Sequence, residues 1–121
     1  MNNLFQWGKF IGASGRELDW KIECDALSDE DWACIAQVLG PKLPPFSGLT
    51  YVPTGGAKLM TRLMDFATVR LDTLLVVDDV WTTGSSMRKV GENYAGRDWI
   101  GAVAFARGPL PDNVFAFARI G

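Results

Sequence analysis

Histidine is absent from this chain of 121 residues, and its absence narrows the chemistry open to the protein. Histidine is the commonest general base in enzymes and a frequent zinc ligand. A Cys/His zinc site is therefore excluded, and any acid–base catalysis would fall to carboxylates or solvent. Cysteine is scarce as well, because only Cys24 and Cys34 occur and they do not form a C-x-x-C pair. We expect two buried, reduced thiols.

A strong charge and a long apolar run are also missing. The formal net charge is −2, so the charge balance favours neither nucleic acid nor an anionic membrane as the main partner. The apolar runs are far shorter than the ~20 residues that a membrane-spanning helix needs. The N-terminal residues do not resemble a secretory signal. With 48% apolar and 21% charged residues, the composition predicts one cytoplasmic domain, residues 1–121.

The first forty residues divide into a lead-in and a helix. In the lead-in, residues 1–27, glycines and the alternation of polar and apolar residues in DWKIEC predict a short irregular or hairpin-like segment. The helix covers SDEDWACIAQVLG, with Ser28 as its cap and Asp31 at its third position. Its predicted buried stripe consists of Trp32, Ile35, Ala36 and Leu39.

Strands and helices alternate along residues 28–121, which we expect to form the α/β core. The predicted strands are residues 49–53, 73–80, 99–108 and 113–121. The predicted helices between them are residues 57–66 and 85–94. This alternation predicts a small, mostly parallel sheet of about four strands with flanking helices and right-handed crossovers.

The segment LLVVDDVWTTGSSM, residues 74–87, places two acids and a run of small hydroxylated residues beside a buried strand. In a parallel sheet, ligands bind beyond the carboxyl ends of the strands. The small side chains of residues 82–86 let backbone N–H groups at a helix start close on an anion such as phosphate. Two carboxylates would repel a phosphate, but they accept hydrogen bonds from a diol well. The segment therefore predicts a site for a ribose 5-phosphate.

This segment resembles the phosphoribosyl pyrophosphate signature of the type I phosphoribosyltransferases: an apolar strand, paired acids, one or two apolar residues, then T-T-G-[ST]. The resemblance implies that Asp78 and Asp79 hold the ribose hydroxyls and are the best candidates for catalytic residues. It implies Mg²⁺ as well, carried mainly by the ligand, with the same two acids as candidate metal contacts. The residues that it places around the 5-phosphate are Thr82, Thr83, Gly84, Ser85 and Ser86.

Two further segments resemble the orotate branch of this family. YVPTGGAKL resembles the loop that faces the diphosphate, and FIGASGRELDWKIECDAL resembles the hood of that branch. Arg107 ends a predicted strand where the orotate branch carries an arginine beside the base, and a guanidinium would suit a carboxylated base such as orotate. The family's dimers imply a homodimer. The residues added to the site are Thr54, Gly55, Gly56, Lys58 and Arg107.

The two acids also have other interpretations. A strand ending in Asp-Asp also resembles the magnesium-binding strand of P-loop ATPases, but G-x-x-x-x-G-K-[ST] is missing from the sequence, as is G-x-G-x-x-G. Alone, Asp78 and Asp79 would suit a solvated strand end. The Thr-Thr-Gly-Ser run directly after them favours the ribose-phosphate site.

The other candidates have ordinary structural interpretations too. These residues are Gly55, Gly56, Lys58, Trp81, Arg16 and Arg107. For the glycines the alternative is a tight strand-to-helix turn, and for the lysine it is a solvated helix surface. For the tryptophan it is packing over the loop instead of a flat surface for a base. For the arginines the equally weighted alternative is an ordinary surface position.

The chain departs from the family before the acid-bearing strand. Family members place a further strand and a mobile cationic loop there, whereas this chain has only residues 65–73, with Arg70 as their one cation. That loop neutralises the leaving diphosphate and excludes water. We therefore expect either a phosphoribosyltransferase acting on a nucleobase such as orotate or a catalytically weak ribose-phosphate-binding or regulatory module. We also expect a helix running almost directly into the strand at Leu74 and slow turnover.

Overall fold

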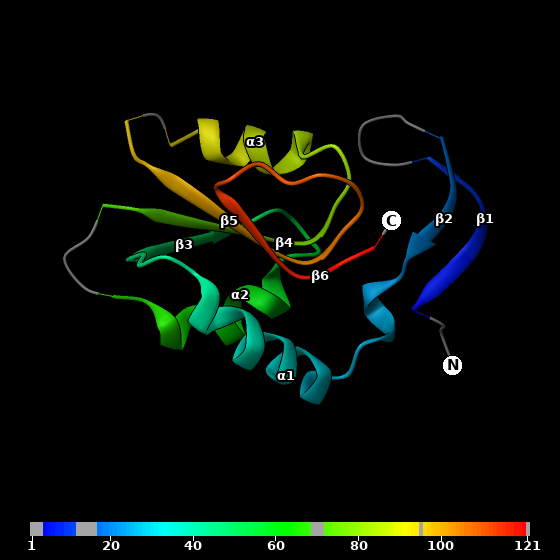
Figure 1. Cartoon of the computed structure of the whole chain (residues 1–121), viewed down its shortest axis with the longest axis horizontal. Coiled ribbons are helices and arrows are strands. Elements are labelled where there is room, and N and C mark those ends of the chain that lie inside the picture. Colours follow the sequence, from blue (N-terminus) through cyan, green and yellow to red (C-terminus); the bar gives the residue numbers. More distant parts are fainter. Residues whose placement is uncertain (1–3, 12–16, 69–71, 95, 121) are drawn as a thin grey trace.

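The computed structural model describes residues 4–11, 17–68, 72–94 and 96–120 of the chain. The elements in chain order are β1 (Phe5–Ile11), β2 (Glu17–Ile22), η1 (Cys24–Ala26), α1 (Asp29–Leu39), η2 (Gly40–Lys42), β3 (Gly48–Tyr51), α2 (Ala57–Leu63), η3 (Met64–Phe66), β4 (Leu74–Trp81), α3 (Ser85–Glu92), β5 (Trp99–Ala106) and β6 (Val114–Arg119). The predicted alternation of strands and helices after α1 is confirmed (Figure 1).

The core sheet has four parallel strands, as the sequence predicted, and their order is β3-β4-β5-β6. β4 pairs with β3 on one side and β5 on the other, so that Val77 lies between Tyr51 and Ala102. A central parallel strand is covered on both faces, which explains its unbroken apolar run. The first four residues of β4 are buried, and Val76 and Val77 expose no surface.

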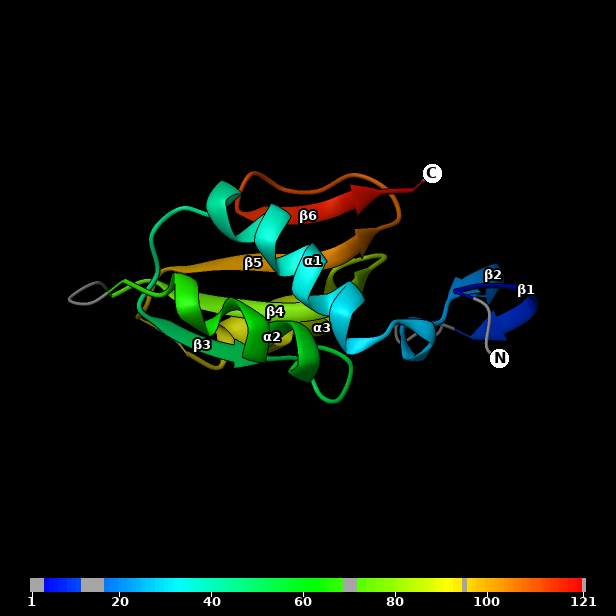
Figure 2. The same ribbon diagram turned by 90° about the horizontal axis from the view of Figure 1, so that it is seen from below.

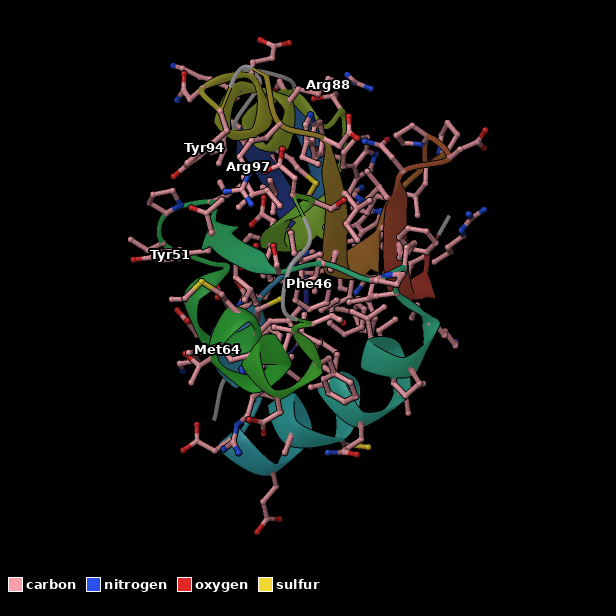
Figure 3. All side chains as sticks on the ribbon, turned by 90° about the vertical axis from the view of Figure 1, so that its left-hand side faces the viewer. Phe46, Tyr51, Met64, Arg88, Tyr94 and Arg97 are labelled. Atoms are coloured by element: carbon pink, nitrogen blue, oxygen red, sulfur yellow. The ribbon has the colours of Figure 1, made fainter. Side chains whose placement is uncertain are left out.

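Helices cover both faces of the sheet. In Figures 1 and 2, α3 lies on one face and α1 with α2 lies on the other. Successive residues of a strand point to opposite faces. Leu75 and Val77 therefore belong to the cluster around α1 and α2, whereas Leu74 and Val76 belong to the cluster that contains α3. Phe46 lies between the sheet and the α1–α2 layer and is 1% exposed (Figure 3).

The prediction of right-handed crossovers is wrong for one connection. The steps from β3 to β4 and from β4 to β5 run in the same direction across the parallel sheet, but their helices lie on opposite faces. Two such connections must have opposite hands. The connection through α3 is right-handed and the one through α2 is left-handed (Figures 2 and 3). Right-handed connections account for about 98% of cases in general, so this one is unusual.

The short segment before β4 accounts for this hand. α2 lies where a right-handed crossover to a strand on the outer side of β3 would place it. Within the described ranges, no strand falls between η3 and β4, and β3 forms the edge of the sheet. The expected absence of an additional strand thus holds for the described residues. Arg70 lies outside them.

The start of α1 is capped as the sequence predicted. The Ser28 Oγ accepts a hydrogen bond from the Asp31 N–H (3.1 Å), and the Asp31 carboxylate accepts one from the Ser28 N–H (2.9 Å). This reciprocal pair satisfies two backbone donors at the helix start. The predicted stripe is also buried, with exposed fractions between 0% and 4%. Its residues are Trp32, Ile35, Ala36 and Leu39.

The two cysteines differ in burial. Both are free thiols, but only Cys24 is buried, whereas Cys34 is exposed. The prediction of two buried thiols is therefore wrong for Cys34. Its neighbours Ile35 and Ala36 belong to the buried stripe of α1, and the helical period of 3.6 residues turns Cys34 away from it.

The lead-in forms a two-stranded antiparallel hairpin, β1 and β2, with a register irregularity between Trp7 and Phe10. Trp20 packs against two aromatic residues of β1, because its ring centroid lies 6.0 Å from that of Phe5 and 6.2 Å from that of Trp7. We call β1, β2 and η1 the hood. It lies beyond the carboxyl ends of the core strands (Figure 2). Arg16 falls outside the described residues.

The described helices are all short. Among the residues that the structure describes, no helix has the length and apolar character needed to cross a membrane.

Candidate functional site

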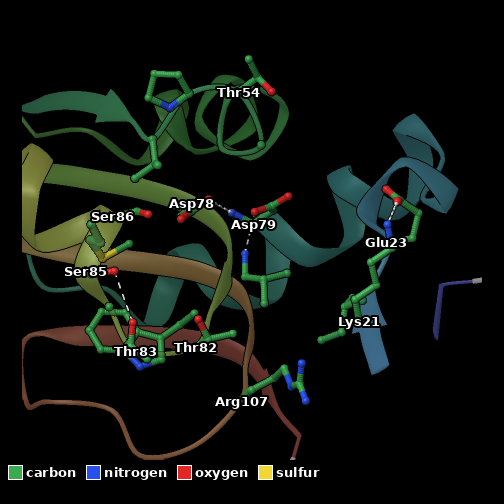
Figure 4. A pocket seen from close by; sticks show the side chains of 18 of the residues that line it. Lys21, Glu23, Thr54, Asp78, Asp79, Thr82, Thr83, Ser85, Ser86 and Arg107 are labelled. Carbon is green, nitrogen blue, oxygen red and sulfur yellow. Dashed lines mark hydrogen bonds and ion pairs between the residues drawn. The ribbon is translucent and has the colours of Figure 1, made fainter. Parts of the chain in front are cut away.

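A cavity of about 400 Å³ lies at the carboxyl ends of β3, β4 and β5, where the core meets the hood (Figure 4). This is the position at which parallel α/β sheets bind ligands. The structure brings most of the predicted site residues to this one cavity. Those in its lining are Thr54, Gly55, Asp78, Asp79, Thr82, Thr83, Gly84, Ser85, Ser86 and Arg107.

Gly84 is the turning point of the predicted phosphate loop. Its φ of +81° lies in the left-handed region that favours glycine. A Cβ at this position would come within 2.1 Å of the Trp81 ring, which is 3% exposed. The loop therefore folds directly over the Trp81 ring, which supports the packing role for this tryptophan. The Arg88 guanidinium lies 5.3 Å from the same ring and donates to the Thr83 carbonyl (3.1 Å).

The start of α3 presents backbone donors to the cavity. The first N–H groups of a helix have no acceptor within it, and here they belong to Ser85, Ser86 and Met87. Gly84 is the N-cap residue and has no side chain with which to accept them. The hydroxyls of Thr83 and Ser85 lie 3.3 Å apart at the same place. Donors, hydroxyls and the positive end of the helix dipole make this loop suited to an anion.

Asp78 and Asp79 lie inside β4, near its carboxyl end. The predicted strand, residues 73–80, agrees with the observed bounds Leu74–Trp81 to within one residue at each end. Neighbouring residues of a strand point to opposite faces. Both acids nevertheless line the cavity, because it lies at the end of the sheet. The Asp78 carboxylate accepts from the Asp79 N–H and the Asp79 carboxylate from the Val80 N–H, both at 2.8 Å.

Burial raises the pKa of Asp78, the hydrogen bond and negative charge of Asp79 act in the same direction, and together they bring the pKa from 3.8 to about 8. Asp78 is therefore largely protonated at neutral pH, and the pair carries one negative charge instead of two. A neutral carboxyl group can donate as well as accept hydrogen bonds. Burial and, as a smaller cause, the negative charge of Asp79 also raise the pKa of the Cys24 thiol. This cysteine therefore remains an unreactive thiol.

Gly55 and Gly56 bring the first loop against β4. A Cβ on Gly55 would lie 2.4 Å from an oxygen of Asp79, and one on Gly56 would lie 2.2 Å from the Val77 carbonyl oxygen. The loop, which contains a cis peptide bond between Pro53 and Thr54, can therefore approach the acids only with glycine at these positions. Gly55 lines the cavity, whereas Gly56 is buried behind it. The two glycines thus let the loop pack closely against β4 while Gly55 remains accessible to a ligand in the cavity.

Lys58 is placed apart from the other predicted residues. It is exposed on α2 and lines a second cavity, between α1 and α2, together with Asp29 and Asp65. Leu59 and Leu63 turn toward the sheet, so the helical period directs Lys58 to the α1 side. This position fits the solvated-lysine interpretation.

The hood supplies lining residues that the sequence analysis did not single out. They are Lys21, Ile22, Glu23 and Asp25. Lys21 forms an ion pair with Glu23 (3.3 Å), and the Glu23 carboxylate also accepts from the Asp25 N–H (3.3 Å). No local motif marks these residues as ligand-facing. Their alternation in DWKIEC could have indicated a surface-facing side, but not what that side faces.

Arg107 holds the hood against the core. Its guanidinium donates to the Trp20 carbonyl (2.8 Å) and lies 3.7 Å from the centroid of the Trp20 ring. The contact joins the end of β5 to a residue that lies 87 positions away in the sequence. Arg107 thus lines the cavity while its charge is directed toward the hood (Figure 4).

The acids suit a magnesium ion that is carried mainly by a ligand. Within the described part of the chain, no group of three or more His, Cys, Asp or Glu side chains could hold a metal ion. Mg²⁺ is usually bound by one or two carboxylates together with substrate phosphates and water. The pair Asp78 and Asp79 meets that requirement, and the neighbouring phosphate-suited loop supplies the place for the phosphates.

No protein-family model matches the chain, and no curated protein matches it. Solved structures do. An orotate phosphoribosyltransferase from Aeropyrum pernix superposes with a TM-score of 0.74 and 20% identity over 96% of this chain and 88% of that one. An orotate phosphoribosyltransferase from Mycobacterium tuberculosis H37Rv gives a TM-score of 0.60 and 18% identity over 96% and 89%.

The UMP synthase of Leishmania donovani gives a TM-score of 0.69 and 14% identity, over 97% of this chain but 34% of the larger one. At these identities the likeness establishes the fold and no more. The chain has the type I phosphoribosyltransferase fold.

Proposed function

We propose that this chain, with its type I phosphoribosyltransferase fold, binds ribose 5-phosphate or phosphoribosyl pyrophosphate in the cavity at the carboxyl ends of β3 to β5. In this proposal the backbone donors at the start of α3 take the 5-phosphate. Asp78 and Asp79 take the ribose hydroxyls, and the loop at Thr54 and Gly55 faces the diphosphate.

One observation supports the proposal above all others. An uncapped helix start and a pair of carboxylates line the same cavity of about 400 Å³. The first group attracts an anion, whereas the second repels one and accepts hydrogen bonds from hydroxyls. A ligand that satisfies both must carry a phosphate at one end and a diol at the other. A ribose 5-phosphate has this arrangement.

Mg²⁺ would neutralise the charge of a bound diphosphate as it leaves. Asp78 and Asp79 are the residues that would contact this ion. The chain's own contribution would be to orient the ribose between the two loops and to limit water on the hood side. If the chain transfers phosphoribosyl groups, it is a pentosyltransferase, and its acceptor is a nucleobase.

A second function is favoured by the missing strand. Only residues 67–73 separate η3 from β4, and β3 is an open edge. A binding module without a cationic loop would hold the ligand but would lack groups that stabilise the leaving diphosphate. Such a loss could cost several kcal/mol of barrier, hence orders of magnitude in rate (about 1.4 kcal/mol for each tenfold).

One paired experiment separates the two functions. Calorimetry measures the binding of phosphoribosyl pyrophosphate with Mg²⁺, and a diphosphate-release assay with a panel of nucleobases measures turnover. Binding with release supports the transferase, and binding without release supports the module. No binding of phosphoribosyl pyrophosphate or ribose 5-phosphate would contradict the proposal as a whole. A turnover number of about 10 per second would contradict the weak-binder alternative, unless a partner chain supplied the cations.

A further inference from the structure

The hood forms the part of the cavity that neither the phosphate nor the diol would occupy. Its lining side chains include Lys21 and Glu23, which lie across Asp79 from the phosphate loop (Figure 4), and Asp25. Arg107 completes this part from the end of β5. We call these four residues the acceptor wall. If the two loops hold the 5-phosphate and the hydroxyls of a ribose, the remaining substituent, the base at C1, would be turned toward them.

Both cations of the acceptor wall are already directed toward the hood. The Lys21 Nζ lies 3.3 Å from a carboxylate oxygen of Glu23, and both side chains are partly buried, with exposed fractions of 37% and 24%. Arg107 donates to the Trp20 carbonyl at 2.8 Å and lies against the Trp20 ring. An anionic acceptor would have to compete with these contacts for either positive charge.

Acids outnumber cations among the described residues that line the cavity. Even with Asp78 largely protonated, the acids Glu23, Asp25 and Asp79 face two cations, Lys21 and Arg107. Asp25 is exposed at the start of η1, where its carboxylate can accept hydrogen bonds from a ligand. Like charges in a partly buried cavity repel, and carboxylates favour N–H donors. The electrostatics of this wall therefore oppose a carboxylated base.

We propose that the acceptor wall selects an uncharged nitrogen base bearing amino or ring N–H donors and rejects a base that carries a carboxylate. Glu23 and Asp25 would be the specificity-determining residues. The inference rests on the proposed function, because it assumes that a ribose phosphate fixes the position of the base. It differs from the expectation, drawn from resemblance, that Arg107 would bind orotate.

Three pyrimidines form a matched series for the test. Orotate is uracil with an added carboxylate, and cytosine replaces one carbonyl of uracil by an amino group. Calorimetry first measures the affinity of ribose 5-phosphate alone. Each base is then titrated into protein saturated with ribose 5-phosphate. We expect cytosine to bind most tightly and uracil next. Orotate should bind at least about tenfold more weakly than uracil, since a charged hydrogen-bonded contact typically changes affinity ten- to hundredfold.

The variant Glu23→Gln tests the acceptor wall directly. The glutamine carbonyl can still accept from the Asp25 N–H, so the hood keeps its local contact. Lys21 loses its ion-pair partner, and one negative charge leaves the wall. We expect the affinity for orotate to rise about tenfold and that for ribose 5-phosphate to stay unchanged. Glu92→Gln is the control. This substitution removes the same charge, and Glu92 is exposed at the far end of α3.

The outcomes separate the inference from the function beneath it. Failure of ribose 5-phosphate to bind the wild-type protein overturns both. If ribose 5-phosphate binds but orotate binds as tightly as uracil or more so, the inference is overturned and the proposed function stands. The same holds if neither cytosine nor uracil binds detectably. An equal effect of Glu23→Gln and Glu92→Gln on orotate would show that net charge, and not the acceptor wall, sets the preference.

Discussion

The starts of α1 and α3 show two opposite treatments of the same backbone groups. At α1, the side chains of Ser28 and Asp31 satisfy the exposed N–H groups, and three acids in the first turn offset the helix dipole. At α3, Gly84 offers no side chain, and the first turn carries no acid. A helix start whose N–H groups are capped by its own side chains contributes to the stability of the fold. A helix start whose N–H groups are uncapped and face a cavity can bind a ligand.

Replacing Gly84 should give the largest effect. In Gly84→Val the new side chain meets the left-handed φ and the Trp81 ring, so the loop must move. Backbone strain and overpacking together cost on the order of 2–5 kcal/mol, and much of it should appear as lost binding of ribose 5-phosphate. Calorimetry measures the affinity, and circular dichroism checks that the domain remains folded. Unchanged affinity in a folded variant would refute the phosphate loop.

Gly96 provides a matched control for that experiment. Its φ is +90°, but nothing lies within 4 Å of a Cβ placed there. Gly96→Val therefore carries the backbone strain without the ring overlap. We expect it to lower stability by only about 1–2 kcal/mol and to leave ligand affinity unchanged.

A change in the loop at Gly55 should affect binding of the diol and not of the phosphate. In Gly55→Ala the new methyl group would meet the Asp79 carboxylate at 2.4 Å and push it away from the ribose. We expect the affinity for ribose 5-phosphate to fall about tenfold, since one charge-assisted hydrogen bond contributes about 1.5–3 kcal/mol. The affinity for inorganic phosphate should stay the same. A fall in both affinities would show that the loops do not act on separate parts of the ligand.

The buried acid predicts a pH-dependent stability. The pKa of Asp78 is raised from 3.8 to about 8 in the folded state. The folded state therefore binds this proton more tightly, and the free energy of unfolding falls as pH rises from about 4 to about 8. In Asp78→Asn this contribution is absent. The Tm of the variant should therefore rise relative to that of the wild type as the pH increases from about 5 to about 8. For Asp112→Asn, an exposed control, the difference in Tm from the wild type should stay constant over this range.

The smallest effect is expected at the closed helix start. Ser28→Ala removes the cap of α1 and should lower the free energy of unfolding by about 1 kcal/mol. Ligand affinity should not change, because α1 covers the face of the sheet away from α3 and Ser28 does not line the cavity. Chemical denaturation measures the stability and calorimetry the affinity. A marked loss of ribose 5-phosphate binding would mean that the two helix starts do not have separate roles.

Local sequence patterns predicted most of the fold. The cap at Ser28, the buried stripe that begins at Trp32 and the apolar run of β4 each depend on neighbours within a few residues. These features were confirmed. The patterns did not predict the left-handed connection through α2, since the hand follows from the position of a whole helix.

The site was less accessible to prediction than the fold. The loops around Asp79 and Gly84 carry recognisable motifs, and the structure places them at one cavity. Glu23 faces the same cavity from the hood, and the contact of Arg107 with Trp20 joins residues far apart in the chain. The sequence has no local signal for either, although Arg107 itself was among the predicted site residues. The placement of Lys58 away from the cavity likewise depends on which side of α2 meets the sheet.

The central claim is that one cavity holds a phosphate and a diol at separate places. The most direct test is the affinity of ribose 5-phosphate and of inorganic phosphate for the wild type and for Asp78→Asn with Asp79→Asn, measured by calorimetry. The account predicts that the double variant weakens ribose 5-phosphate by about tenfold or more, because the charge-assisted hydrogen bonds to the hydroxyls are lost. Inorganic phosphate should bind as well as before or more tightly. Equal weakening of both ligands would contradict the claim.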